Sequence, residues 1–97
     1  MKIELLTAAF KDLKRGRSFY EEQQEGLGRY FFDSLFSDIE SLQLYAGIHP
    51  VVYGYHRLLS KRFPYAIYYR MKASETVLIY RILDCRQSPY KTKDQLT

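Results

Sequence analysis

Arginines and tyrosines recur among aliphatic residues in the stretch from Lys61 to Arg86. A guanidinium group binds carboxylates and phosphates, and a tyrosine ring offers a flat face for stacking. Residues 61–70 and 76–86 are rich in residue types that favour strands, and a turn is expected over Lys72–Glu75 between them. The stretch therefore predicts an antiparallel hairpin that presents positive charge and rings to a polyanionic or acidic partner.

The two faces of this hairpin should differ, because successive side chains of a strand point to opposite sides of the sheet. In the first strand the two sets are Tyr65, Ile67, Tyr69 and Met71, and Ala66, Tyr68 and Arg70. One face is predicted to be core, and the other to carry arginine and tyrosine. In the second strand Arg81 shares a register with Val77, Ile79 and Leu83, so it either interrupts a core face or marks a β-bulge.

The net charge of +4 is unevenly distributed along the chain. Residues 1–48 hold six Lys and Arg against eight Asp and Glu, whereas residues 49–97 hold nine against three. The basic half is also the strand-rich half. Such polarity favours a partner of opposite charge. The plainer alternative is a solvated basic face that binds nothing.

Size and composition place the chain among small globular proteins. Its 97 residues suffice for one domain with a core, and 46% of them are hydrophobic. Cys85 is the single cysteine, so neither an internal disulfide nor a cysteine zinc cluster is expected, and no metal or cofactor is predicted. No apolar run approaches the roughly 18 residues of a membrane span. We expect a soluble cytoplasmic protein with no membrane partner.

The first 28 residues predict a strand and a helix. Lys2–Leu6 reads as a strand, and Thr7 as the N-cap of a helix over Ala8–Gln24 with a thin apolar stripe. Gly16 within this helix either weakens it or allows a neighbouring backbone to approach. The glycines of Glu25–Gly28 should end the helix.

The strongest helical pattern runs from Arg29 to Ala46. Apolar residues recur there at helical spacing, at Phe31, Phe32, Leu35, Phe36, Ile39 and Leu42. The opposite side is polar and includes Asp38. Gly47 and Pro50 end the segment in the order typical of helix termini.

Val51–Leu59 is predicted as one strand, followed by a turn over Ser60–Pro64. Residues 87–97 are polar, contain Pro89, and are expected to form a loosely ordered tail of a single domain spanning 1–97. The element order is thus β-α-α-β-β-β. This order indicates an α+β fold in which a helical hairpin covers one face of a mostly antiparallel sheet. The second face should be open, and the cations should gather on it.

Four segments along the chain are distinctive in combination: Thr7-Ala8-Ala9-Phe10-Lys11-Asp12-Leu13, Gly47-Ile48-His49-Pro50, Arg62-Phe63-Pro64-Tyr65-Ala66-Ile67-Tyr68-Tyr69 and Ile82-Leu83-Asp84-Cys85-Arg86-Gln87-Ser88-Pro89. With them the chain resembles the RelE/ParE family of bacterial toxins from type II toxin-antitoxin systems. The resemblance covers nearly the whole chain and implies the same element order. It also implies a cytoplasmic toxin that a small antitoxin wraps over and holds inactive.

The two branches of that family act differently, because RelE-like toxins cut messenger RNA on the ribosome and ParE-like toxins block DNA gyrase. Metal-free RNA cleavage needs a proton acceptor, a proton donor and cations near the phosphorus. The resemblance implies that Arg86 and Tyr90 would serve a RelE-like site, with His56 and Arg57 compensating for missing lysines. Ala66 stands where that branch has an arginine. The depleted set of cations favours the ParE-like branch, a gyrase inhibitor without chemistry of its own.

Three functions follow as hypotheses: a ParE-like gyrase inhibitor, a RelE-like ribosome-dependent endonuclease, and a non-toxic nucleic-acid-binding module. Whether the chain is an enzyme depends on the branch. The partners implied are a cognate antitoxin and either DNA gyrase or the ribosome with its mRNA. The residues predicted to contact the target or the antitoxin are Arg57, Lys61, Arg62, Arg70, Arg81, Arg86 and Lys91.

Overall fold

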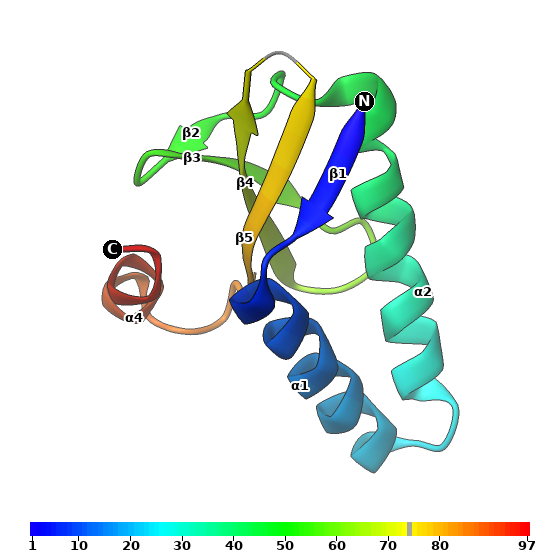
Figure 1. Cartoon of the computed structure of the whole chain (residues 1–97). Coiled ribbons are helices and arrows are strands. Elements are labelled where there is room, and N and C mark those ends of the chain that lie inside the picture. The colour runs from blue at the N-terminus through cyan, green and yellow to red at the C-terminus, as the bar shows by residue number, and fades with distance from the viewer. Residues whose placement is uncertain (74) are drawn as a thin grey trace.

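The computed structural model describes residues 1–73 and 75–97 and shows an α+β fold (Figure 1). The elements are β1 (Lys2–Leu5), α1 (Thr7–Gln23), α2 (Leu27–Glu40), α3 (Leu42–Tyr45), β2 (Val51–Val52), β3 (Tyr55–Leu59), β4 (Tyr65–Lys72), β5 (Thr76–Asp84) and α4 (Pro89–Leu96). The strands form one open sheet in the order β1-β5-β4-β3-β2, in which β1 and β5 are parallel and the other neighbouring strands are antiparallel. The predicted fold class is confirmed. Among the described residues, no helix combines the length and apolar character needed to cross a bilayer.

Helices α1 and α2 pack together on one face of the sheet and form the main core with β4 and β5. They meet closely at Gly16, where a Cβ atom would lie 2.6 Å from Cζ of Phe31. The close approach predicted at Gly16 is therefore to an aromatic ring and not to a backbone. The prediction of Thr7 as N-cap is wrong, because the helix already includes Thr7 and Leu6 precedes it without a side-chain cap.

The predicted long helix from Arg29 to Ala46 is divided at Ser41, between α2 and α3. The Ser41 hydroxyl donates to the carbonyl of Asp38 at 2.6 Å, a side-chain bond that competes with regular helical pairing. The Asp38 carboxylate, predicted on the polar side, is buried and accepts a hydrogen bond from the Ser60 hydroxyl at 2.7 Å. Gly47, at φ 94°, follows α3 as expected.

The prediction of one strand over Val51–Leu59 is wrong, because the segment folds into the hairpin of β2 and β3. Tyr53 and Gly54 lie at its turn with φ of 53° and 83°. Two consecutive positive φ values are the signature of a tight hairpin turn, for which asparagine or glycine is the usual first residue. Because Tyr53 occupies this position, the sequence does not indicate the turn.

Strands β4 and β5 form the predicted antiparallel hairpin. The turn predicted over Lys72–Glu75 includes Ser74, which lies outside the described residues. The pairing register shifts between Tyr68, which opposes Arg81, and Tyr69, which opposes Ile79. Of the two predictions for Arg81, the β-bulge is thus confirmed.

The second face of the sheet carries its own apolar cluster, so it is not the open cationic surface that the sequence predicts. The cluster consists of Tyr55, Ala66, Tyr68, Leu83 and Leu96, with Tyr80 packed against it. Leu96 comes from α4, which lies on the side of the sheet away from α1 and α2 (Figure 1). Residues 87–97, predicted as a loosely ordered tail, therefore include a helix. Ser88 caps it by accepting from the Lys91 N–H, and Pro89 occupies its first turn.

Candidate functional site

Arg81 is engaged inside the fold. Its guanidinium makes two hydrogen bonds to the Asp12 carboxylate, at 2.7 and 2.9 Å, and a third to the carbonyl of Gln95 at 3.1 Å. Asp12 also accepts the backbone N–H of Ile82 at 3.0 Å, next to the bulge. This network joins α1, β5 and α4, and it leaves only 20% of the Arg81 side chain exposed.

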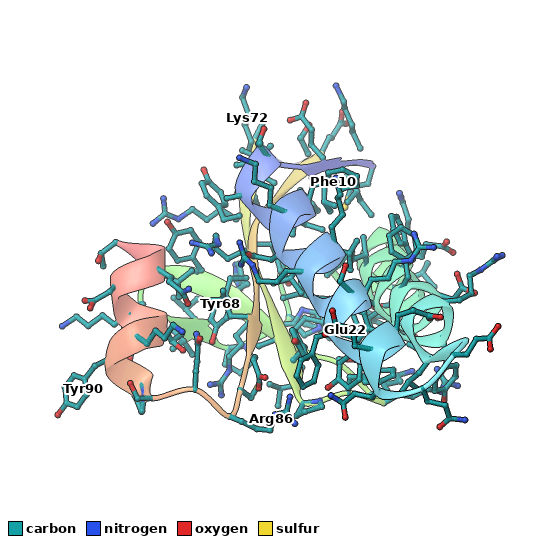
Figure 2. All side chains as sticks on the ribbon, turned by 90° about the horizontal axis from the view of Figure 1, so that it is seen from below. Phe10, Glu22, Tyr68, Lys72, Arg86 and Tyr90 are labelled. Atoms are coloured by element: carbon teal, nitrogen blue, oxygen red, sulfur yellow. The ribbon has the colours of Figure 1, made fainter. Side chains whose placement is uncertain are left out.

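Arg86 follows β5 and holds Asp84 through two hydrogen bonds of 2.9 and 2.7 Å. This pairing lowers the pKa of Asp84, with the guanidinium hydrogen bond as the largest cause. The Arg86 side chain is still 54% exposed, so one face of it remains accessible to a partner. Its place in the loop between β5 and α4 is visible in Figure 2.

Arg57 and Arg70 lie on the second face of the sheet. Arg70 stacks its guanidinium 3.9 Å from the centroid of the Tyr55 ring and donates to the carbonyl of Gly54 at 3.0 Å. Arg57 lines a small pocket of about 150 Å³ together with Tyr68 and Cys85. Burial raises the pKa of Tyr68, an effect that the nearby Arg57 opposes.

His56 points to the opposite side of the sheet, toward the helices. Its Nδ1 lies 2.8 Å from the carbonyl oxygen of His49, which can only accept, so this nitrogen carries a proton. The His56 ring stacks on Tyr69 with centroids 5.0 Å apart. The Tyr69 hydroxyl accepts from the N–H of Gly47 at 2.8 Å and is 2.5 Å from Nδ1 of His49. Burial, and next the charge of His56, lower the pKa of His49.

The structure does not gather the four residues predicted for RNA cleavage into one site. His56 and Arg57 are neighbours in β3 and point to opposite faces, and Arg86 is paired to Asp84. Tyr90 is 82% exposed on α4 and points away from the body of the protein (Figure 2). Of the remaining predicted contact residues, Lys61 and Arg62 are exposed in the loop before β4.

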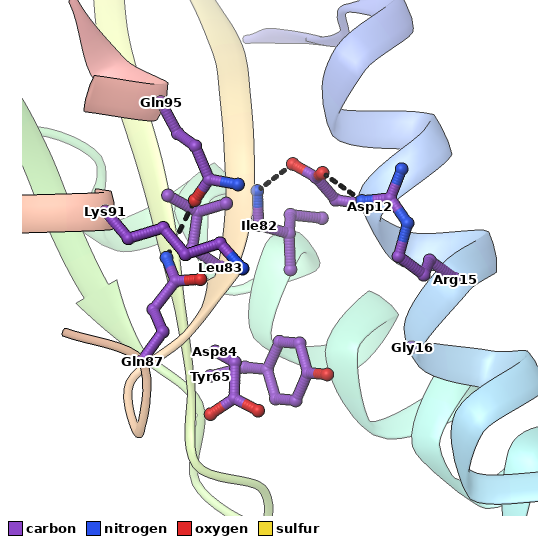
Figure 3. A pocket seen from close by; sticks show the side chains of 10 residues that line it. All are labelled: Asp12, Arg15, Gly16, Tyr65, Ile82, Leu83, Asp84, Gln87, Lys91 and Gln95. Atoms are coloured by element: carbon purple, nitrogen blue, oxygen red, sulfur yellow. Dashed lines mark hydrogen bonds and ion pairs between the residues drawn. The ribbon is translucent and has the colours of Figure 1, made fainter. Parts of the chain in front are cut away.

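Lys91 lines a groove between α1 and α4 that crosses the end of β5. We call this the α1–α4 groove; its lining residues are Arg15, Phe19, Tyr65, Asp84, Arg86, Gln87 and Lys91. Figure 3 shows Arg15 and Lys91 coming from opposite sides, above Tyr65 and Asp84. Sequence reasoning missed Arg15 and Phe19, because α4 had been predicted as a tail and left α1 without a neighbour on that side.

Comparison with known proteins identifies the family. Residues 3–89 match the model of the family described as ParE toxin of type II toxin-antitoxin system, parDE. The chain belongs to the ParE toxin family. A search of curated proteins found no match. Among solved structures, a chain of the "Chromosomal ParDE TA system from P. aeruginosa" is similar with a TM-score of 0.72 and 23% identity, over 84% of this chain and 92% of that chain. At this identity the likeness concerns the fold.

For a ParE-type toxin, the family implies an antitoxin partner. The family match confirms the predicted membership of the RelE/ParE family. The matched region ends at Pro89, so α4 and its lysines lie almost entirely beyond it. The α1–α4 groove is accordingly lined by residues inside the matched region and by α4, most of which lies beyond it.

Proposed function

We propose that this ParE-type toxin acts in the cytoplasm by binding and inhibiting DNA gyrase, and that a cognate antitoxin neutralises it. The observation that supports this proposal is the dispersal of the residues that RNA cleavage would need. General acid–base catalysis requires a donor and an acceptor within hydrogen-bond reach of one reacting group. Here His56 uses Nδ1 for a backbone carbonyl, on the face of the sheet opposite to Arg57. A toxin without such a site acts by occupying its target.

Exposed cations are the groups that such a stoichiometric inhibitor would use. Lys61, Arg62 and Lys91 are exposed, and Arg86 is half exposed although it is paired. Exposed charges of this kind steer association and confer specificity on a protein interface. Arg70 is stacked on an aromatic ring, and Arg81 is committed to Asp12, so we assign them to the support of the fold rather than to target binding.

The test compares two readouts with purified toxin. We expect the toxin to block supercoiling by gyrase and to trap gyrase–DNA complexes, while an mRNA in a translation reaction stays intact. Cut transcripts with unaffected gyrase would establish the RelE-like endonuclease instead. Nucleic-acid binding with neither effect, and no growth arrest on expression, would leave the non-toxic module.

Arg86→Ala supplies a residue-level test of the same proposal. We expect about tenfold weaker gyrase inhibition, which is a typical loss for one contact arginine. The matched control is Arg29→Ala, because Arg29 is also an exposed arginine paired to an aspartate, Asp33, but belongs to α2. Equal effects of the two substitutions would remove Arg86 from the proposed contact surface.

A further inference from the structure

The α1–α4 groove is a distinct concave site. Its outer part has a volume of about 390 Å³, and a smaller inner part of about 130 Å³ extends toward Gly16 and Gln95. The two parts share a wall made of Arg15, Tyr65, Asp84, Gln87 and Lys91. These shared residues join the two parts into one groove.

The charges in the groove are unequally satisfied. The two carboxylates are both neutralised, Asp12 by Arg81 and Asp84 by Arg86, through hydrogen bonds of 2.7 to 2.9 Å. Arg15 has only a 3.4 Å contact with Asp12, and its side chain is 73% exposed. Among the described residues, Lys91 forms no ion pair. Two cations on opposite walls thus remain available for anionic groups of a ligand.

The floor of the groove is aromatic. The Phe19 ring is 45% exposed and packs edge-on against Tyr20, with centroids 5.1 Å apart. Burial, and next the Asp84 charge, raise the pKa of Tyr65 to about 12, so its hydroxyl is protonated at neutral pH and able to donate. An exposed phenylalanine in the same groove as the weakly paired Arg15 and Lys91 suits a ligand that carries both apolar and acidic groups.

We propose that the α1–α4 groove binds an acidic, partly apolar peptide segment of the antitoxin, with Arg15 and Lys91 contacting its carboxylates and Phe19 packing against its apolar side chains. The inference that the peptide belongs to the antitoxin rests on the proposed function. A nucleic-acid strand fits this groove less well, because phosphates at regular spacing need a row of cations, and the groove offers Arg15 and Lys91. A peptide places its carboxylates only at the two cations.

The experiment measures binding of a short fluorescein-labelled peptide rich in Glu and Leu, and of its Gln-for-Glu counterpart, to the full-length toxin by fluorescence anisotropy. We expect the Glu peptide to bind and the Gln peptide to bind at least about tenfold more weakly. The double variant Arg15→Glu/Lys91→Glu should weaken binding of the Glu peptide by about tenfold or more. Phe19→Ala should weaken binding of both peptides.

The matched control is Lys11→Glu/Lys93→Glu. It makes the same change of charge on the same two helices, at exposed residues that do not line the groove. We expect its affinity to stay within about twofold of the parent chain. Equal losses in the two double variants would overturn the groove and indicate attraction by net charge alone. Circular dichroism and the unfolding midpoint verify that both fold.

Two further readouts locate the ligand and separate this inference from the proposed function. On addition of the Glu peptide, the amide NMR signals of Arg15, Phe19 and Gln87 should shift more than those of β1. Tighter binding of a single-stranded DNA of equal length at these residues would overturn the peptide assignment. Gyrase inhibition is measured without peptide. A toxin that inhibits gyrase and binds no peptide contradicts the groove alone, whereas one that binds peptide and spares gyrase contradicts the proposed function alone.

Discussion

Asp12 is the residue on which the interior of this protein most depends. Its carboxylate is almost fully buried, and it accepts hydrogen bonds from the Arg81 guanidinium and from the N–H of Ile82. The pairing of β1 with β5 ends at Ile79, and beyond this point Asp12 supplies the acceptor for the N–H of Ile82. Removing one partner of a buried ion pair lowers the stability strongly, because the remaining charge is left buried without a counter-charge.

We predict that Asp12→Ala lowers the free energy of unfolding by about 3 kcal/mol or more, because it leaves the Arg81 charge and the Ile82 N–H unpaired. Urea denaturation measures this change. In the control Asp33→Ala, which removes the exposed partner of Arg29, the loss should stay below about 1 kcal/mol. Similar losses at the two positions would show that the buried network contributes no more than a surface ion pair.

The pH dependence of stability should report His49. The folded state holds the pKa of His49 below its ordinary value of 6.5, so the unfolded chain takes up the proton first as the pH falls. The contribution of His49 is therefore complete above pH 6.5 and is lost as the pH drops below that value. The side-chain amide of His49→Gln can still form a hydrogen bond with Tyr69. The free energy of unfolding of this variant should fall less than that of the parent chain as the pH is lowered from 7. Parallel pH curves for the two proteins would refute this prediction.

At the scale of elements, the packing of α1 on α2 depends on the absence of a side chain at Gly16. Alanine is intrinsically better than glycine in a helix by about 1 kcal/mol. Here a Cβ would meet the Phe31 ring at 2.6 Å, and that ring is fully buried among Tyr20, Phe63 and Tyr65. A shift of the ring would therefore disturb these aromatic contacts.

We predict that Gly16→Ala destabilises the protein by about 1 to 3 kcal/mol, the usual cost of overpacking a core, despite the better helix propensity of alanine. The control is Ser18→Ala, an exposed position in the same helix, where only propensity acts and stability should rise slightly. Thermal unfolding of both variants gives the comparison. A stabilised Gly16→Ala chain would mean that α1 and α2 separate easily.

Sequence patterns predicted the elements whose periodicity is strong, such as α2, β4 and β5. They failed where a residue adopts a backbone conformation that its type rarely adopts, as Tyr53 does at φ 53° in the β2–β3 turn. They also failed for α4, whose composition is polar and which has only Thr92 and Leu96 buried. Ser88 followed by Pro89 is a helix-start signal that could have revealed α4.

At the scale of the whole molecule, the sheet has an apolar cluster on each face, and α4 covers the smaller one. The end of α4 is held in place by several contacts. Leu96 is 6% exposed, and its carbonyl accepts a hydrogen bond from the Tyr55 hydroxyl at 3.0 Å. The carbonyl of Gln95 accepts a hydrogen bond from Arg81. The structure thus gives the C-terminus a packing role.

We predict that Leu96→Ala costs about 2 kcal/mol, because it removes the side chain that α4 inserts into the second cluster. Amide hydrogen exchange should become faster in α4 and stay unchanged in β4. Tyr90→Ala, at an 82% exposed position of the same helix, should change stability by less than about 0.5 kcal/mol. Equally fast exchange in α4 of the parent chain and of Leu96→Ala would show that the helix is open before the substitution.

The sequence predicted which residues carry charge but not which of them are free. Arg81 and Asp12 are 69 positions apart, and no local pattern indicates that they pair. Arg86 and Asp84 are two positions apart, a spacing that allows a local ion pair. The α1–α4 groove could not be anticipated at all, because its two walls come from opposite ends of the chain.

The parallel pairing of β1 with β5 has a consequence for the synthesis of the protein. Lys2 lies beside Thr76, and Leu5 lies beside Ile79. Strand β1 is translated first, but it can pair only after β5 has been synthesised. A nascent fragment that stops short of β5 leaves its opening strand without a partner and the two helices without most of their sheet. We therefore expect the sheet and its core to form only after β5 has been synthesised.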